Sequence, residues 1–257
     1  MKNLKLKLVS LVIKIPFNQN FLKFIQKIIG FHQGRGWEFN TIKTEINSCI
    51  SLIKKEPKIF IDIGANKGLY TKEILFKFPQ LECHIFEPAE QNYKILKKEI
   101  NHSKSKINKI ALSSSSGKEI IYSDYPGSGL ASLAQRRLNH HNINFDHKEE
   151  VSTMRFDEYW SNNEQIIDYI KIDVEGFELD VLNGFGKLIQ NIKLIQFEFG
   201  GANIDTRTYF QDFWYFFQDN NFSLFRINPR GVTKISNYSE DIECFLTTNF
   251  IALNNNL

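Results

Sequence analysis

The stretch PKIFIDIGANKGLYTKEILFKF (residues 57–78) changes from the pattern of a buried strand to that of a helix within a few residues. Residues 59–63 form a short apolar run, which predicts a strand. A turn with two glycines follows, and apolar side chains then recur at helical spacing from Tyr70 to Phe78. A strand that leads through a tight turn into a helix is the unit of a parallel sheet. We therefore expect the start of an α/β domain here.

The same plan recurs along the rest of the chain. Further strand-like runs lie at 83–86, INKIALS (107–113), 169–172 and IKLIQFEFG (192–200), and the first and third of these lead into helical patterns. Residues 207–221 predict a helix that packs aromatic side chains on the sheet, and 222–227 and 249–254 predict a closing antiparallel pair. Strands that alternate with helices imply a mostly parallel sheet with helices on both faces.

The composition fits one sizeable domain. The chain has 257 residues, of which 42% are apolar and 14% aromatic, enough for an ample core, so disordered and collagen-like classes are excluded. Its three cysteines, Cys49, Cys83 and Cys244, form no C-x-x-C pair. Neither a disulfide framework nor a zinc ribbon is indicated, and a reducing, cytoplasmic setting is expected.

The N-terminus differs in charge from the rest of the chain. Residues 1–60 contain eleven Lys and Arg against three acidic residues, so the remainder is net acidic and is expected not to bind nucleic acid. Leu4, Leu8 and Leu11 share a helical face opposite Lys7, and Pro16 is expected to end that helix. We predict a basic, amphipathic extension (1–56) before the domain at 57–257.

Two interpretations of this extension stay open. Residues 1–30 could rest on the anionic inner face of a membrane as a peripheral contact, or they could pack as a cap on the domain. A membrane span needs about 20 apolar residues in a row, and no such run is present.

The glycine turn and the next strand indicate a nucleoside cofactor. Parallel sheets bind ligands at the carboxyl ends of their strands. Gly64 and Gly68 suit a close approach of backbone to ligand, but their spacing differs from the G-x-G-x-x-G of dinucleotide sites. Asp62, at the strand end, suits a ligand with an ammonium and a sulfonium better than a diphosphate. Glu87, 23 residues after Gly64, can accept hydrogen bonds from both ribose hydroxyls.

Together these motifs resemble the FkbM family of S-adenosylmethionine-dependent methyltransferases, over roughly residues 57–253. The resemblance lies in IDIGANKGLYT (61–71), FEPAEQNYKIL (86–96), IALSSSSG (110–117), YIKIDVEGFELDVLNG (169–184) and IQFEFG (195–200). It implies a class I, Rossmann-like sheet of seven strands with the last one antiparallel. It also implies O-methylation with S-adenosylmethionine, commonly of a sugar hydroxyl in a glycan, glycolipid or natural product.

The resemblance also implies positions for the cofactor residues. Gly64, Asn66 and Gly68 would form the loop on the methionine side with Asp62 behind it, and Glu87 would hold the ribose beside Pro88. The adenine would be bordered by Ala111, Leu112 and Ser113, with no acidic residue near.

Acidic residues after the strand at 169–172 are the candidate catalytic groups. Asp173 and Glu175 would face the same side if strand geometry continues that far. Asp173 is then expected to orient or deprotonate the acceptor hydroxyl, while Glu175 and Lys171 tune the site. Alternatively, Glu175 and Glu178 occupy the first turn of a helix, with Asp180 on the solvated surface. A Mg²⁺ site is a third interpretation, and we expect no metal.

Other candidates contact the acceptor. Residues 125–150 are expected to form a mobile lid, from which His140 or His141 could act as the base and Arg136 or Arg137 could hold an anionic group. Glu198 ends the strand at 192–200 and is expected to touch the acceptor. The alternatives to an O-methyltransferase are a catalytically inactive binding protein of the same fold and a nucleotide-sugar or NAD enzyme.

Overall fold

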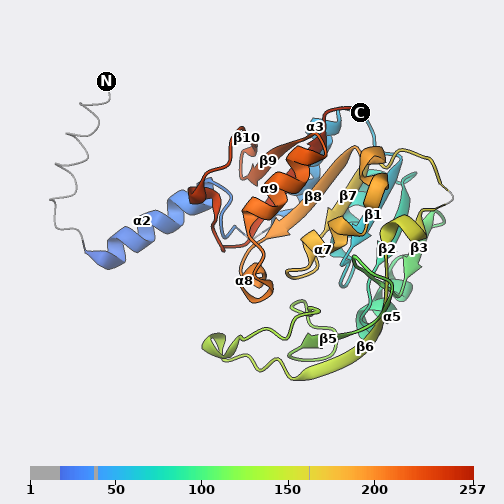
Figure 1. Cartoon of the computed structure of the whole chain (residues 1–257), viewed down its shortest axis with the longest axis horizontal. Coiled ribbons are helices and arrows are strands. Elements are labelled where there is room, and N and C mark those ends of the chain that lie inside the picture. The colour runs from blue at the N-terminus through green and yellow to red at the C-terminus, as the bar shows by residue number, and fades with distance from the viewer. Residues whose placement is uncertain (1–17, 38–39, 162) are drawn as a thin grey trace.

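A mixed sheet of eight strands runs through the protein (Figure 1), for which the computed structural model describes residues 18–37, 40–161 and 163–257. In chain order the strands are β1 (Ile59–Ile63), β2 (Glu82–Phe86), β3 (Ser105–Asn108), β7 (Tyr169–Ile172), β8 (Leu194–Phe199), β9 (Phe222–Asn228), β10 (Gly231–Ile235) and β11 (Thr248–Asn254). Across the sheet their order is β10-β9-β11-β8-β7-β1-β2-β3.

The strand directions confirm a class I methyltransferase sheet. Strands β3, β2, β1, β7 and β8 are parallel to one another, and β11 is inserted antiparallel between β8 and β9. The prediction of seven strands was one short in this sheet, because β10 pairs with β9 as an antiparallel hairpin at its edge. Residues 231–235 contain a threonine and a lysine at exposed positions, so they lack the apolar pattern of a buried strand.

A second, three-stranded sheet covers one side of the molecule. It consists of β4 (Ala111–Leu112), β5 (Gly117–Ser123) and β6 (His147–Met154), in the order β4-β6-β5. The prediction of a single third strand at 107–113 was wrong: β3 ends at Asn108, and β4 pairs instead with β6. Figure 1 shows β5 and β6 below the carboxyl ends of the main sheet, with the connecting segment 124–146 beneath α8 (Ala202–Thr206).

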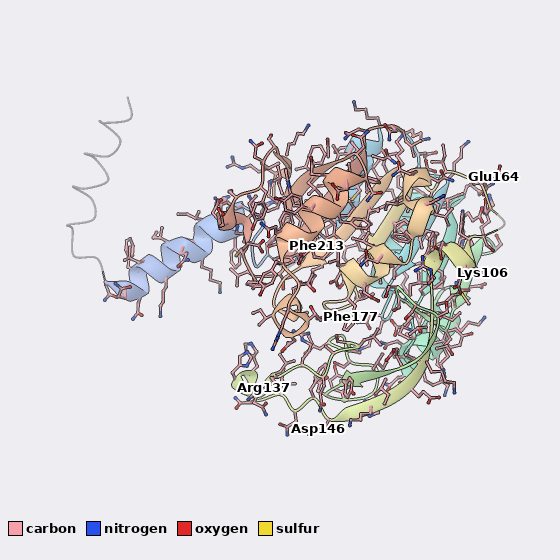
Figure 2. All side chains as sticks on the ribbon, in the orientation of Figure 1. Lys106, Arg137, Asp146, Glu164, Phe177 and Phe213 are labelled. Atoms are coloured by element: carbon pink, nitrogen blue, oxygen red, sulfur yellow. The ribbon has the colours of Figure 1, made fainter. Side chains whose placement is uncertain are left out.

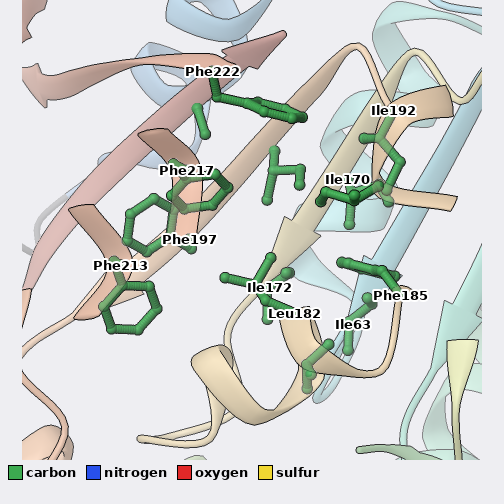
Figure 3. Close-up of a cluster of buried hydrophobic side chains, with 14 of the residues drawn as sticks. Ile63, Ile170, Ile172, Leu182, Phe185, Ile192, Phe197, Phe213, Phe217 and Phe222 are labelled. Carbon is green, nitrogen blue, oxygen red and sulfur yellow. The ribbon is translucent and has the colours of Figure 1, made fainter. Parts of the chain in front are cut away.

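Helices cover both faces of the main sheet. They are α3 (Ile42–Ile53), α4 (Leu69–Lys77), α5 (Glu90–Glu99), α6 (Phe156–Tyr159), α7 (Glu178–Asn183) and α9 (Phe210–Asp219). The 3-10 turns η1 (Asn139–His141), η2 (Gly186–Asn191) and η3 (Glu240–Ile242) lie in connecting segments. One buried cluster packs α9 against the sheet, and Figure 3 shows Phe213 and Phe217 beside Phe197 of β8. The aromatic packing predicted for this helix is confirmed.

The opposite face is covered by α3 and α4. Ile46 and Cys49 of α3 share a buried cluster with Phe60 of β1 and Ile74 of α4. Part of the segment before residue 57 therefore packs into the core of the sheet. The division at residue 57 stays a prediction.

α2 (Gln19–His32) projects away from this body (Figure 1), and none of its residues is buried. The helix predicted around Leu4, Leu8 and Leu11, with its end at Pro16, lies outside the described residues. In the described part of the chain, no helix combines the length and apolar character needed to cross a bilayer.

Candidate active site

A cavity of about 870 Å³, partly open to solvent, lies at the carboxyl ends of β1, β2, β7 and β8. The chain order reverses between β1 and β7, since β2 and β3 lie on one side and β8 on the other. Such a switch point is where open α/β sheets bind ligands. The wall of the cavity includes Gly64, Asn66, Glu87, Pro88, Asn92, Ala111, Leu112, Asp173, Glu175 and Glu198.

The glycine turn touches the end of β7. Gly64 has φ +79°, and a Cβ atom there would lie 1.9 Å from the carbonyl oxygen of Asp173. Gly68 has φ +75°, and a Cβ atom there would lie 2.6 Å from the side chain of Leu96. Gly64 therefore requires glycine for space as well as for conformation, because the atom it meets belongs to the backbone, whereas at Gly68 the positive φ is the stronger requirement.

Glu87 connects this turn to the end of β2. Its carboxylate accepts hydrogen bonds from the backbone N–H groups of Asn66, at 2.8 Å, and Ala89, at 2.9 Å. Burial raises the pKa of Glu87 to about 7. Ionisable groups with shifted pKa values are common at binding sites.

Three buried oxygen atoms around the turn accept no hydrogen bond from any described residue. They are Oδ1 of Asn66 and Oδ1 of Asn92, both on residues of the cavity wall, and Oδ1 of Asp62 behind the turn. The other carboxylate oxygen of Asp62 accepts from the Thr71 hydroxyl at 2.5 Å, and burial raises the pKa of Asp62. Buried acceptors without a donor are costly, so this edge suits a ligand that supplies donors.

The far end of the cavity is more apolar. Pro88, Ala111 and Leu112 contribute to its wall, whereas Ser113 does not. The Ser113 hydroxyl donates to Asp180 at 2.7 Å, and Ser114 donates to the same carboxylate through its N–H and hydroxyl groups. The expectation that Asp180 is solvated surface was therefore wrong, because this carboxylate ties α7 to the chain after β4.

The chain after β7 leaves strand geometry at once. Glu175 has φ +55° and Gly176 has φ +103°, so the condition for Asp173 and Glu175 to face the same side, that strand geometry continues as far as Glu175, is not met. α7 begins at Glu178, which places Glu175 before the first helical turn. The buried Glu178 carboxylate accepts from the N–H groups of Val174 and Gly176, and burial raises its pKa to about 7.

Lys171, Asp173 and Glu198 are brought together at the strand ends. Lys171 Nζ lies 2.9 Å from Asp173 Oδ2. Burial alone would lower the pKa of Lys171, but the charges of Asp173 and Asp62 outweigh it and raise that pKa. Burial, together with the charges of Asp173, Glu175 and Glu178, raises the pKa of Glu198 well above its ordinary value.

Arg136 is held within the protein. Its guanidinium is 8% exposed and contacts Glu175 Oε2 at 2.7 Å and Asp205 Oδ2 at 3.3 Å. Burial raises the pKa of Glu175 to about 8, although Arg136 opposes this shift. The guanidinium expected to hold an anionic acceptor is therefore already engaged by two carboxylates.

His140 lies elsewhere. It is exposed on η1, its ring stacks beside His141, and it is not part of the wall of this cavity. Figure 2 labels Arg137 and Asp146 on the same outer segment, with Phe177 between that segment and the sheet. This placement brings Asp173 and Glu198 together and leaves His140 apart from them.

Several wall residues were not predicted from the sequence. Asn92 and Phe177 contribute to the cavity, as do Ser128, Gly129 and Ser132 of the segment 124–146. The FEPAEQN motif contains Asn92 one helical turn after Pro88, so its position on α5 was a usable signal. The serines and Gly129 carry no such pattern. In the part of the chain that the structure describes, no three His, Cys, Asp or Glu side chains gather as a metal site would require.

The sheet order is that of a class I methyltransferase fold, and the cavity lies at its switch point. Residues 62–224 match the family described as "Methyltransferase FkbM domain", and the chain belongs to that family.

The chain is also similar to three other proteins. The 2-O-methyltransferase NoeI of Sinorhizobium fredii (strain NBRC 101917 / NGR234) is 24% identical over 191 residues, which cover 70% of this chain and 78% of that protein. The plantazolicin methyltransferase BpumL, solved with SAH, is 11% identical with a TM-score of 0.48, over 84% of this chain and 83% of BpumL. A SAM-dependent O-methyltransferase of Thermotoga maritima is 15% identical with a TM-score of 0.40, over 82% and 64% of the two chains. Both TM-scores are below 0.5, so the fold assignment depends on the sheet order itself.

Proposed function

We propose that this protein transfers a methyl group from S-adenosylmethionine to a hydroxyl oxygen, and that the hydroxyl belongs to a sugar in a glycan, glycolipid or natural product. The observation that carries this proposal is the position of Asp173 and Glu198 in the wall that the first cavity shares with a second one. The family supports methyl transfer. The similarity to an enzyme named as a 2-O-methyltransferase supports oxygen as the acceptor.

The residues of the first cavity fit the cofactor. The unpaired Oδ1 atoms of Asn66 and Asn92 are acceptors that the ammonium and hydroxyl groups of S-adenosylmethionine would satisfy. Glu87 would hold the ribose hydroxyls, with Gly64 and Gly68 admitting the methionine part and Pro88, Ala111 and Leu112 bordering the adenine. Ser113 would support this border from behind through Asp180.

The acidic residues then have separate tasks. When bound, the cofactor supplies a methyl group on a positively charged sulfur; its C–S bond breaks as the new C–O bond forms, and sulfur keeps the electron pair. Asp173 accepts the proton that the hydroxyl oxygen loses, and the adjacent Lys171 fixes the position of the carboxylate. Glu198 hydrogen-bonds the acceptor. Glu175 acts through Arg136 by positioning the segment 124–146 over the site.

Calorimetry with SAH and a methyl-transfer assay test this function. Asp173→Asn is expected to lower kcat by about 100-fold or more while SAH affinity stays within a few-fold, whereas His140→Ala is expected to change neither. Loss of activity in His140→Ala alone would move the base to the segment 124–146. Binding of SAH without methyl transfer to any hydroxyl would instead favour a catalytically inactive binding protein.

Treatment with EDTA tests the metal interpretation. We expect the rate of methyl transfer to stay unchanged; a rate that falls with EDTA and recovers when Mg²⁺ is added would indicate a metal site.

We further propose that α2 rests on an anionic lipid surface, as a peripheral contact with the inner membrane face. Its residues Lys23 and Lys27 are basic, and it contains no acidic residue. Two large apolar side chains of this helix face solvent: Phe24 is 59% exposed and Ile29 is 51% exposed. Apolar residues with lysines on one helix favour binding at an anionic interface.

Flotation with vesicles tests the lipid contact. The full chain is expected to float with vesicles of phosphatidylcholine and phosphatidylglycerol, and to float poorly with phosphatidylcholine alone. The double variant Phe24→Asp, Ile29→Asp should lose this binding, while Phe76→Asp, which changes an exposed residue on α4, should retain it. Equal flotation of all three proteins would contradict the proposed contact.

A further inference from the structure

The second cavity lies against the first and is separately built. It measures about 1020 Å³ with the solvent in its open mouth included, and it shares Gly64, Asn66, Gly129, Asp173 and Glu198 with the cofactor cavity. With the cofactor in the first cavity, its methyl group would lie near this shared wall. The acceptor molecule would then reach the methyl group from the second cavity. Methyl transfer requires the acceptor oxygen in line with the bond that breaks. The second cavity has the position that an acceptor site needs.

The wall opposite the shared residues comes from outside the matched domain. Trp37, Thr41, Ile42 and Glu45 precede residue 62, and Thr247 and Asn249 follow residue 224. α3 and β11 therefore provide the surface that faces the acceptor. Because these wall residues lie outside the range that matches the family, we expect them to determine the substrate specificity of this chain.

Gln196 of β8 fixes two residues of this wall. Its Nε2 donates to Glu45 Oε2 at 2.6 Å and to Asn249 Oδ1 at 3.1 Å. Its Oε1 accepts from the hydroxyls of Tyr70, at 2.7 Å, and Tyr169, at 2.5 Å. All the hydrogen-bonding capacity of the fully buried amide is used, so Glu45 and Asn249 are held in place before any ligand arrives.

The charges of the cavity disfavour an anion. Glu45, Asp173 and Glu198 present carboxyl groups to it; burial raises the pKa of Glu45 and of Glu198 and so favours their uncharged forms, and Lys171 is already paired with Asp173 at 2.9 Å. Lys67 is exposed at the edge of the cavity. Carboxyl groups and side-chain amides bind hydroxyl groups as hydrogen-bond acceptors and donors. A phosphate or a carboxylate would lose its hydration there without meeting a buried, unpaired cation.

We propose that the cavity between α3 and the carboxyl end of β8 is the acceptor site, and that it takes an uncharged sugar ring which stacks on Trp37 and hydrogen-bonds Glu45. This inference rests on the proposed methyltransferase function and adds the substrate class and two specificity residues. An aromatic ring covers the apolar face of a sugar, while its rim of hydroxyls meets the polar wall.

Binding to the full chain loaded with SAH tests the site. The probes are methyl glycosides of neutral hexoses, compared with methyl glycosides of hexuronic acids and with hexose 6-phosphates, by ligand-observed NMR and by methyl transfer. Neutral glycosides are expected to bind at least tenfold more tightly than either anionic group. Trp37→Ala and Glu45→Gln should each raise the KM for the neutral acceptor about tenfold, with SAH affinity within twofold of the parent. Trp37→Phe should recover most of the loss.

Two controls keep the outcomes separate. Phe76→Ala and Glu56→Gln change exposed residues outside the second cavity and should leave KM unchanged. Thermal unfolding of each variant shows whether it is folded. Tighter binding of the anionic sugars, or an unchanged KM in both Trp37→Ala and Glu45→Gln, would overturn the acceptor site. SAH binding without any glycoside binding would also overturn it and leave the cofactor site intact, whereas failure to bind SAH would refute the proposed function itself.

Discussion

Arg136 and Glu175 form an ion pair of 2.7 Å that joins the segment 124–146 to the loop after β7. The same guanidinium contacts Asp205 of α8 at 3.3 Å, and the Ser132 hydroxyl donates to the backbone carbonyl of Glu175 at 2.8 Å. Three parts of the chain that are distant in sequence thus meet at one buried cation. The segment is anchored at the entrance of the cofactor cavity, where Ser128 and Ser132 contribute to the wall.

Removal of this anchor is expected to loosen the segment. Arg136→Ala leaves the largely buried Glu175 and Asp205 without their cation, which costs roughly 3 kcal/mol for a pair of this kind. The loss of the positive charge also raises the Glu175 pKa further, because Arg136 opposes the effect of burial, and without the guanidinium nothing joins the segment to Glu175 and Asp205 through this side chain. Amide hydrogen exchange within 124–146 should become faster and the acceptor KM should rise.

Arg137→Ala is the matched control, because that side chain is exposed and its backbone N–H contact with Asp205 survives the substitution. Equal exchange rates in Arg136→Ala and the parent protein would contradict the anchoring role.

The glycine turn gives a second prediction. Gly64→Ala would place a methyl group 1.9 Å from the carbonyl oxygen of Asp173, so the backbone must move. We expect a loss of about 3 kcal/mol or more in the free energy of unfolding and at least tenfold weaker SAH binding.

Gly231→Ala controls for the backbone conformation alone: the φ of Gly231 is +118°, with nothing within 4 Å of the added Cβ atom. That variant should lose only about 1 kcal/mol and keep its SAH affinity. Similar denaturation midpoints for the two variants would show that the close approach of residue 64 to the Asp173 carbonyl oxygen does not affect stability.

The sequence predicts the parts of this site that depend on local pattern. The strand, glycine turn and helix around Gly64 follow from the spacing of apolar residues, and Glu87 follows from its place at the next strand end. Glu45 could not be found this way. It meets Gln196, 151 positions along the chain, only because α3 packs on the sheet. A contact of that kind depends on tertiary packing, of which a single sequence carries no periodic trace.

Glu175 illustrates a different difficulty. The alternation of a strand predicted that it would face the same way as Asp173, but the backbone turns at Glu175 and Gly176, both with positive φ. A glycine at position 176 permits such a turn, because glycine adopts a positive φ at little cost. The structure also leaves no room for a side chain there, since a Cβ atom would lie 2.9 Å from the carbonyl oxygen of Ala202. The close approach of α8 that makes glycine necessary is again a tertiary contact.

Cofactor affinity is expected to depend on pH through Glu87. Burial raises the pKa of Glu87 to about 7, and the ionised carboxylate is the better acceptor for two ribose hydroxyls. SAH affinity should therefore rise as pH increases through about 7 and level off above it. Glu87→Gln should weaken SAH binding about tenfold at pH 8 and abolish the pH dependence.

Calorimetry at pH 6 and pH 8.5 measures both effects. Glu90→Gln is the control, since Glu90 lies on the same motif but is exposed and pairs with Lys94 and Lys109. A pH dependence that persists in Glu87→Gln would assign it to another group.

Glu178 makes the folded state less stable as pH rises. Its carboxyl is 1% exposed and has a pKa of about 7 in the folded chain, against 4.5 as its ordinary value. Between these values the folded chain holds a proton that the unfolded chain has released. The contribution of Glu178 to the free energy of unfolding is therefore greatest below pH 4.5 and falls as pH rises toward and through 7, by up to about 3 kcal/mol.

Glu178→Gln keeps a side-chain acceptor for the N–H groups of Val174 and Gly176 and removes the titration. Urea denaturation at pH 5 and pH 8 should show a smaller loss of stability for Glu178→Gln than for the parent protein. Glu164→Gln, an exposed position far from the site (Figure 2), should keep the parental difference. If all three proteins lose the same free energy between the two pH values, the buried carboxyl of Glu178 is not the group responsible.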